Sequence, residues 1–133
     1  MPNFWLQFQG IEQHHNSNFT LNFLPKTSTK PLIAKSPLTI TPNPFEVNQS
    51  ITITVDINST ATDCDGITNP NKVYMHSGVG TDANPWTYVT GNWGQDDGVG
   101  EMTDMGGGLW QITIVPETHY GLNATQAATI TKM

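Results

Sequence analysis

Apolar and polar residues alternate strictly from Ile51 to Ile57, which is the clearest periodic pattern along the chain. Successive side chains of a β-strand point to opposite faces, so this alternation predicts a strand with one buried face. Shorter patterns of the same kind predict further strands over residues 72–76, 86–89 and 109–114. We expect six side chains of the first and last of these strands to be buried: Ile51, Ile53, Val55, Trp110, Ile112 and Ile114.

Polar, glycine-rich segments separate the predicted strands. Residues 58–71, 78–85 and 91–100 are predicted loops, and three consecutive glycines at 106–108 precede the last strand. No window repeats apolar residues at helical spacing over three turns, although residues 126–133 fit either a short helix or the start of another strand. Short strands between turn clusters predict an all-β protein of the immunoglobulin-like β-sandwich type.

The first forty residues differ from the rest and predict an extended N-terminal arm. Alternating apolar residues at Phe4–Phe8 and Phe19–Phe23 predict two short strands, and the proline- and lysine-containing stretch 26–37 predicts a linker. We place the boundary within Thr41-Pro42-Asn43-Pro44, so that residues 1–41 form the arm and residues 42–133 form the module. We expect the arm to be ordered by strand pairing within or between chains, with Phe19–Phe23 as the added strand.

Charge is distributed unevenly along the chain. The net charge is −6, with +2 on residues 1–44 and −8 on residues 45–133, and there is no arginine. Nucleic acids and anionic lipid surfaces are bound by clustered positive charge, so neither is an expected partner. The 133 residues suit one domain, and they contain no apolar run long enough to cross a membrane.

The sequence carries no catalytic signature. It lacks a nucleophile elbow, a P-loop, an HExxH zinc motif and a CxxC motif. Its single cysteine, Cys64, has no second cysteine with which to form an internal disulfide, and the pair His14-His15 has no carboxylate at a useful spacing. We therefore expect a non-catalytic protein that needs no organic cofactor.

The most distinctive sequence lies between residues 72 and 114. The stretches that stand out are Val73–Gly78, Trp86, Gly91–Gly98, Met102 and Gly108–Thr113. In these residues the chain resembles the starch-binding β-sandwich modules of carbohydrate-binding module families 25 and 26. It is more similar still to a related module of secreted, surface-targeted proteins of Bacteroidetes, some of them amylase-like, over roughly residues 42–133.

This resemblance implies a secreted or cell-surface protein with an α-glucan ligand. In the starch-binding families a histidine and aromatic residues of this region contact the sugar, which implies that role for His76, Trp86 and Tyr88. Two departures from the pattern are Ser77, at a position that is usually aromatic, and a further apolar strand that the family has after the position of Met133. We therefore expect a fragment lacking the last strand, which would leave an unpaired sheet edge.

The residue types in this region also suit a sugar on physical grounds. A pyranose offers a flat C–H face that stacks on an indole or phenol ring, and its hydroxyls need planar polar partners. The predicted ligand-binding set is His76, Trp86, Tyr88, Asn92, Trp93 and Gln95. Clustered acids supply the oxygen ligands that Ca²⁺ prefers, so a candidate metal site consists of Asp96, Asp97 and Glu101.

Several of these residues also have a structural interpretation. Trp93 fits a loop anchor as well as a sugar contact, and His76 fits a hydrogen-bonded structural histidine. The three acids match no standard calcium loop, and acids in a glycine-rich loop more often face solvent or cap turns.

The sequence leaves two functions open. The first is a non-catalytic module that binds polysaccharide, α-glucan in particular, on an aromatic surface. The second is a structural module of an adhesin or filament, in which the N-terminal arm pairs with a neighbouring chain to form a homo-oligomer. An exposed platform at Trp86 and Trp93 favours the first, and an arm strand in another chain's sheet favours the second.

Overall fold

The computed structural model describes residues 5–11, 16–22, 37–58, 67 and 69–133, and for the first two of these ranges it describes the backbone. Cys64, the pair His14-His15 and the predicted linker before Pro37 lie outside the described residues. The described chain is mostly β-strand with little helix. Its elements are β1 (Trp5–Ile11), β2 (Asn16–Asn22), β3 (Leu38–Thr41), β4 (Ile51–Asp56), β5 (Lys72–Val79), β6 (Tyr88–Thr90), β7 (Thr103–Gly106), β8 (Leu109–Ile114), α1 (Pro116–His119) and α2 (Ala124–Ala127).

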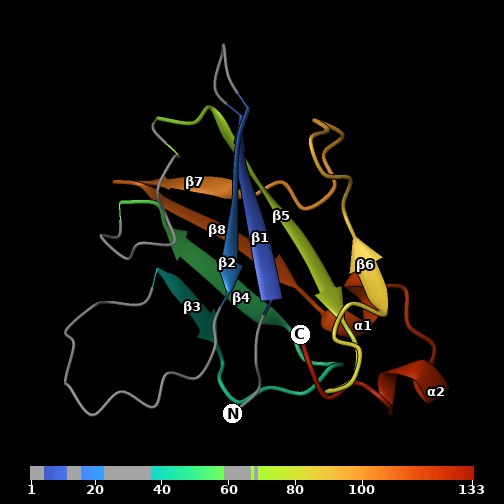
Figure 1. The fold of residues 1–133 in the computed structure, drawn as a ribbon. Helices are drawn as coiled ribbons and strands as arrows, with labels where there is room; N and C mark the ends of the chain where they lie inside the picture. The colour runs from blue at the N-terminus through green and yellow to red at the C-terminus, as the bar shows by residue number, and fades with distance from the viewer. Residues whose placement is uncertain (1–4, 12–15, 23–36, 59–66, 68) are drawn as a thin grey trace, which may run out of the picture.

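The strands form two antiparallel sheets of four strands each (Figure 1). One sheet has the order β2-β1-β5-β6, and the other has the order β3-β4-β8-β7. The chain passes from the second sheet to the first between β4 and β5, and it returns after β6. The predicted all-β class is therefore confirmed as two antiparallel sheets with little helix.

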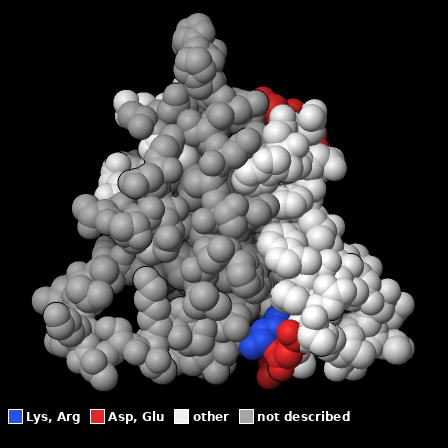
Figure 2. All heavy atoms as spheres, in the orientation of Figure 1, with Lys and Arg blue, Asp and Glu red and all other residues white. Residues whose placement is uncertain are grey.

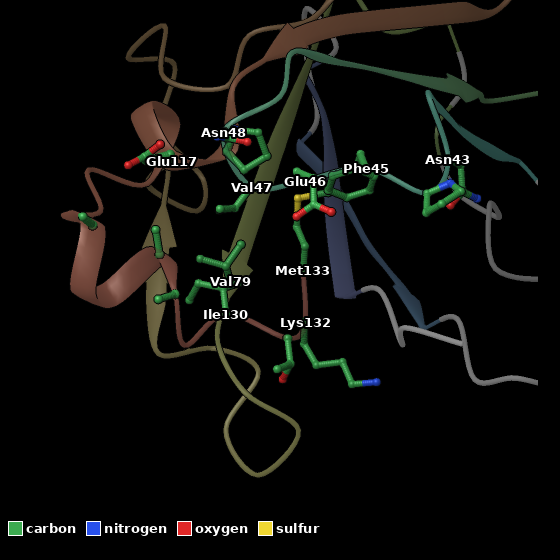
Figure 3. Close-up of a pocket in the computed structure, with 16 residues that line it drawn as sticks. Asn43, Phe45, Glu46, Val47, Asn48, Val79, Glu117, Ile130, Lys132 and Met133 are labelled. Atoms are coloured by element: carbon green, nitrogen blue, oxygen red, sulfur yellow. The ribbon is translucent and has the colours of Figure 1, made fainter.

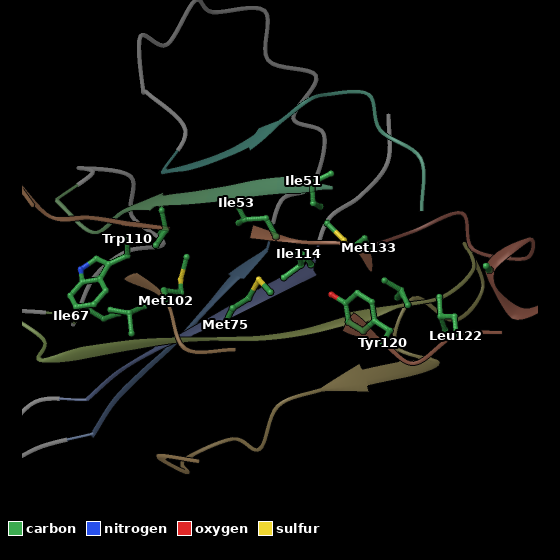
Figure 4. Close-up of a cluster of buried hydrophobic side chains, with 14 residues drawn as sticks. Ile51, Ile53, Ile67, Met75, Met102, Trp110, Ile114, Tyr120, Leu122 and Met133 are labelled. Carbon is green, nitrogen blue, oxygen red and sulfur yellow. The ribbon is translucent and has the colours of Figure 1, made fainter. Parts of the chain in front are cut away.

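Apolar side chains of both sheets meet in a single core (Figure 4). In β4 the residues Ile51, Ile53 and Val55 are buried, and the threonines between them are half-buried, which is the predicted alternation. β5 adds Val73 and Met75 from the other sheet to the same cluster. A central strand that packs against a second sheet has one face shielded from solvent. The apolar residues of that face alternate with polar ones, so β4 could be predicted from the sequence.

The buried positions agree closely with the prediction. Five of the six expected side chains are buried, at relative exposures from 0% for Ile53 to 7% for Ile114. The sixth, Ile112, is half-buried and packs against the edge of the core. It is paired in register with Ile53 of the central strand β4.

Two strands were not predicted, and a third begins later than expected. β3 lies inside the segment assigned to the arm, yet it pairs with β4 from Leu38↔Val55 to Thr41↔Thr52. All four residues of β7 are exposed, so no burial pattern marks that strand. β6 starts at Tyr88, so that Trp86, expected as the first residue of a strand, lies in the preceding turn.

The N-terminal segment pairs with the body of the same chain. β1 lies antiparallel to β5, in register from Leu6↔Ser77 to Ile11↔Lys72, and β2 lies outside β1. The strand beside β5 is therefore β1, whereas the sequence predicts Phe19–Phe23 as the strand added to a free sheet edge. Those residues fall largely in β2, one strand further out.

Of the two alternatives predicted for the last residues, the short helix is present as α2, and the structure assigns no strand to the described residues after it. Asn123 and Gln126 form a reciprocal capping box at the start of α2, with the Asn123 side chain accepting from the Gln126 N–H at 2.9 Å. Beyond the helix, Lys132 forms an isolated antiparallel bridge with Gly80, just after β5. No helix in the described residues is long and apolar enough to cross a membrane.

Candidate functional site

The candidate site is built on the outer face of β5. Side chains alternate along this strand, and Val73, Met75, Ser77 and Val79 are all fully buried on the inner face. The outer face therefore carries Lys72, Tyr74, His76 and Gly78. Loop residues that precede and follow β6 contact each of these positions, so sequence-distant residues converge on one strand.

Trp86 is held against β5 because Gly78 has no side chain. A Cβ placed on Gly78 would lie only 2.5 Å from Cε3 of the indole, so the ring occupies the space that a side chain would need. Trp86 also stacks on His76, with ring centroids 5.8 Å apart and an interplanar angle of 24°. The indole is half-buried, so part of it remains open to solvent.

Trp93 contacts the same histidine from the loop after β6. Its ring lies edge-on to His76, with centroids 5.7 Å apart and an angle of 65°, and 36% of the residue is exposed. We call His76, Trp86 and Trp93 the aromatic platform. The structure thus brings together three of the residues predicted to contact a sugar.

The imidazole at the centre of the platform is held neutral. His76 Nδ1 is buried without a hydrogen bond of good geometry, beside the backbone of Gly91. Burial lowers the pKa of His76 below its usual 6.5, and the Gly91 backbone, which favours the protonated ring, offsets this only in part. The platform therefore presents an uncharged surface at neutral pH.

Beside the platform, two loop carboxylates are fastened to β5. The Tyr74 hydroxyl is hydrogen-bonded to Asp96 and lies 3.1 Å from Glu101 Oε2. Lys72 Nζ lies 2.9 Å from Asp96 Oδ1 and 3.9 Å from Glu101 Oε1. We call Lys72, Tyr74, Asp96 and Glu101 the carboxylate clamp, because it fixes both ends of the segment between the two acids.

The clamp shifts the ionisation of its members in a consistent way. Burial, and then the hydrogen bond to Asp96, raises the pKa of Tyr74 to about 12. The hydrogen bonds from Tyr74 and Lys72 lower the pKa of Asp96 below its usual value. Asp96 is therefore a carboxylate at neutral pH, and Tyr74 is a neutral phenol.

Asp97 belongs to a different set of contacts from its neighbour. Its Oδ2 accepts from Asn92 Nδ2 at 2.6 Å, and its Oδ1 accepts from the Val99 N–H at 2.9 Å. The three acids predicted to share Ca²⁺ therefore face two different groups of donors. Within the described ranges, no group of three or more His, Cys, Asp or Glu residues is placed to hold a metal ion.

The remaining predicted residues divide between the loop and the core. Asn92 is exposed and bonded to Asp97, and Gln95 is exposed with its backbone N–H bonded to the Asn92 carbonyl at 3.1 Å. Tyr88 packs against the core, because it is in register with the inward-facing Val79. The structure therefore does not bring Tyr88 to the platform.

Sequence reasoning missed residues on both sides of the platform. Val89, which is 48% exposed, is in register with Gly78, the residue that Trp86 covers. The sequence predicts Lys72 and Tyr74 as strand residues without a role in binding. The alternation of β5 could have identified them, because positions 72, 74 and 76 share one face of a strand.

A separate groove of about 550 Å³ lies at the Val79 end of β5, the end opposite the clamp residue Lys72 (Figure 3). It is formed by residues 43–48, by the start of α1 and by residues 124–133, and it includes Val79, the last residue of β5. No residue of the platform or the clamp lines it.

Figure 2 shows that most of the described surface on the face seen in Figure 1 is uncharged. Acidic atoms lie at its upper edge, and a second acidic group lies beside basic atoms near its lower edge. In comparisons with known proteins, no family model, no curated protein and no solved structure matches the chain.

Proposed function

We propose that this chain is an immunoglobulin-like β-sandwich module that binds polysaccharide without catalysis, with α-glucan as its ligand, and that it belongs to a secreted or cell-surface protein. The observation that carries this proposal is the half-exposed indole of Trp86, seated on Gly78 and stacked on His76. Two antiparallel four-stranded sheets around one core support the sandwich. The resemblance of residues 72–114 to starch-binding modules supports the ligand and the location.

The chemistry of the platform suits a sugar ring. An indole held in place loses little conformational freedom when a pyranose stacks on it, so the stacking energy appears as affinity. The exposed amides of Asn92 and Gln95 stand beside Trp93 in the sequence and offer donors and acceptors to sugar hydroxyls.

The state of the carboxylates supports a binding role over a catalytic one. A glycosidase needs one carboxylic acid that is protonated at working pH and a second group on the other side of the scissile bond. Here both clamp carboxylates contact the same Tyr74 hydroxyl, so they are held together instead of standing on opposite sides of a bound sugar.

Affinity electrophoresis tests the proposal. In native gels that contain amylose or glycogen, we expect the protein to migrate more slowly than in a plain gel, relative to a non-binding reference protein. Soluble maltoheptaose should restore the mobility by competing for the platform. Unchanged migration with starch, glycogen and other common glucans would contradict the α-glucan proposal.

A second candidate function is assembly through strand exchange, in which the pairing of β1 with β5 would form between two chains instead of within one. β1 is hydrogen-bonded along most of β5, and strand addition of this kind also joins separate chains. An adhesin or filament subunit would place its β1 on the β5 of a neighbouring copy.

Removal of residues 1–36 tests the assembly candidate. We expect the deletion to lower Tm by at least about 5 °C, because the edge of β5 loses its partner. If copies exchange this strand, the molar mass measured by light scattering should also fall to that of a monomer. Deletion of residues 1–4, which precede β1, is the matched control. An unchanged Tm and an unchanged molar mass would exclude the arm from both stability and assembly.

A further inference from the structure

The aromatic platform lies beside a strip of negative charge. Asp96, Asp97 and Glu101 stand against a single lysine, Lys72, so three negative charges and one positive charge leave a local net charge of −2. Each of these three acids is exposed to solvent. An arriving ligand therefore meets unneutralised carboxylates next to the rings.

The distance between the strip and the platform is short. Tyr74 and His76 are two residues apart on the same face of β5, which corresponds to about 7 Å. The Debye length is about 8 Å at physiological ionic strength and about 30 Å at 10 mM salt. A charged group on a ligand stacked at the platform therefore interacts with the clamp carboxylates, strongly so at low salt.

No cation in the described residues is free to receive an anionic ligand. The described residues contain two lysines and no arginine. Lys72 contacts Asp96 and Glu101, and Lys132 lies 3.0 Å from Asp82. The imidazole of His76 stays neutral at neutral pH, because burial opposes its protonation.

We propose that the carboxylate clamp makes the platform selective for uncharged glucan chains and excludes glycans that carry carboxylate or sulfate groups. This inference rests on the proposed sugar binding and adds the class of sugar. Repulsion acts as the discriminating element, because it weakens the wrong ligands without adding a contact to the right one. Asp96 and Glu101 are specificity-determining residues in this scheme, while the rings supply the affinity.

The experiment compares two forms of one polymer. Affinity for amylose and for lightly carboxymethylated amylose of the same chain length is measured by tryptophan fluorescence, in 10 mM and in 1 M NaCl. In 10 mM NaCl we expect the wild type to bind unmodified amylose at least about fivefold more tightly than carboxymethylated amylose. In 1 M NaCl this ratio of affinities should fall below about twofold, because salt screens the repulsion.

Two matched double variants separate the clamp from the overall charge. Asp96→Asn with Glu101→Gln removes two charges beside the platform and keeps oxygen acceptors for Tyr74. Glu46→Gln with Glu117→Gln removes two charges at the groove that includes Val79 (Figure 3). The Val79 side chain lies on the inner face of β5, whereas the platform lies on the outer face. In 10 mM NaCl, the Asp96/Glu101 double variant should lower the ratio of affinities for the two polymers to about twofold. The Glu46/Glu117 double variant should keep most of the wild-type ratio.

Several outcomes would overturn the inference. Equal affinity of the wild type for both polymers in 10 mM NaCl removes the selectivity while leaving glucan binding intact. If both double variants lower the ratio of affinities equally, the selectivity comes from the total charge of the protein, and the clamp has no special role. If circular dichroism shows that the first pair does not fold, Asp97→Asn and Glu46→Gln make the same comparison with one charge each. No binding to unmodified amylose would remove the proposed function and the selectivity together.

Discussion

Gly100→Ala is expected to destabilise the protein by about 2–4 kcal/mol. Gly100 has a φ of +80°, and a Cβ there would lie 2.2 Å from the carbonyl oxygen of Met75. Alanine in this left-handed conformation costs about 1–2 kcal/mol, and forced overpacking costs a similar amount again. The loop at Gly100 cannot easily move away from β5, because the Met75 N–H donates to the Gly100 carbonyl at 2.8 Å. Urea unfolding followed by circular dichroism measures the loss.

Gly98→Ala is the control, because it isolates the effect of the backbone angle. Gly98 lies in the same loop with a φ of +81°, but nothing lies within 4 Å of the position that its Cβ would occupy. We expect this variant to lose only about 1–2 kcal/mol. Equal losses in the two variants would show that the segment around Gly100 does not sit against β5 as described.

Trp86→Ala is expected to weaken binding to α-glucan by at least about 1 kcal/mol, or about fivefold, because one stacking ring is lost. The fold should persist, since Trp86 lies outside the buried core cluster and packs on the outer face of β5. Affinity electrophoresis on amylose gives the change in binding, and circular dichroism gives the state of the fold.

Leu109→Ala supplies the matched control for that substitution. Leu109 is a large apolar residue with 38% exposure, and it lies at the start of β8 in the other sheet. Its truncation should leave glucan binding unchanged. Retention of full affinity by Trp86→Ala would place the sugar elsewhere, and an equal loss in both variants would indicate a general effect on the protein.

The elements that could be predicted from the sequence are those with a strong contrast between their faces. β4 and β8 were predicted within one residue of their bounds, because central strands against a second layer need a dry face. β7 has no buried residue, and the residues of β3 alternate only between half-buried and exposed, so neither strand shows a clear alternation of apolar and polar residues. Their pairing depends on a neighbouring strand, which alternation within a strand does not report.

The candidate site could likewise be predicted only in part: the residue types were informative, but the contacts between distant positions were not. The aromatic residue types pointed to the platform, but only the register with Val79 shows that Tyr88 packs against the core. The adjacency of Asp96 and Asp97 suggested a shared cation. In the structure Asp96 binds Lys72 and Tyr74, more than twenty positions away, whereas Asp97 bonds within its own loop. Contacts at that separation leave no periodic trace in a single sequence.

The pairing of β1 with β5, and of β4 with β8, has a consequence for how the chain is made. Gln7 pairs in register with His76, and Ile53 pairs with Ile112, so paired residues lie about sixty to seventy positions apart in the sequence. Proteins dominated by such non-local contacts fold in milliseconds to seconds, because the intervening chain must be closed into large loops first. During translation, the isoleucines of β4 stay exposed to solvent until its partner β8 has left the ribosome. Assembly of this core is therefore a late event, completed when most of the chain has been translated.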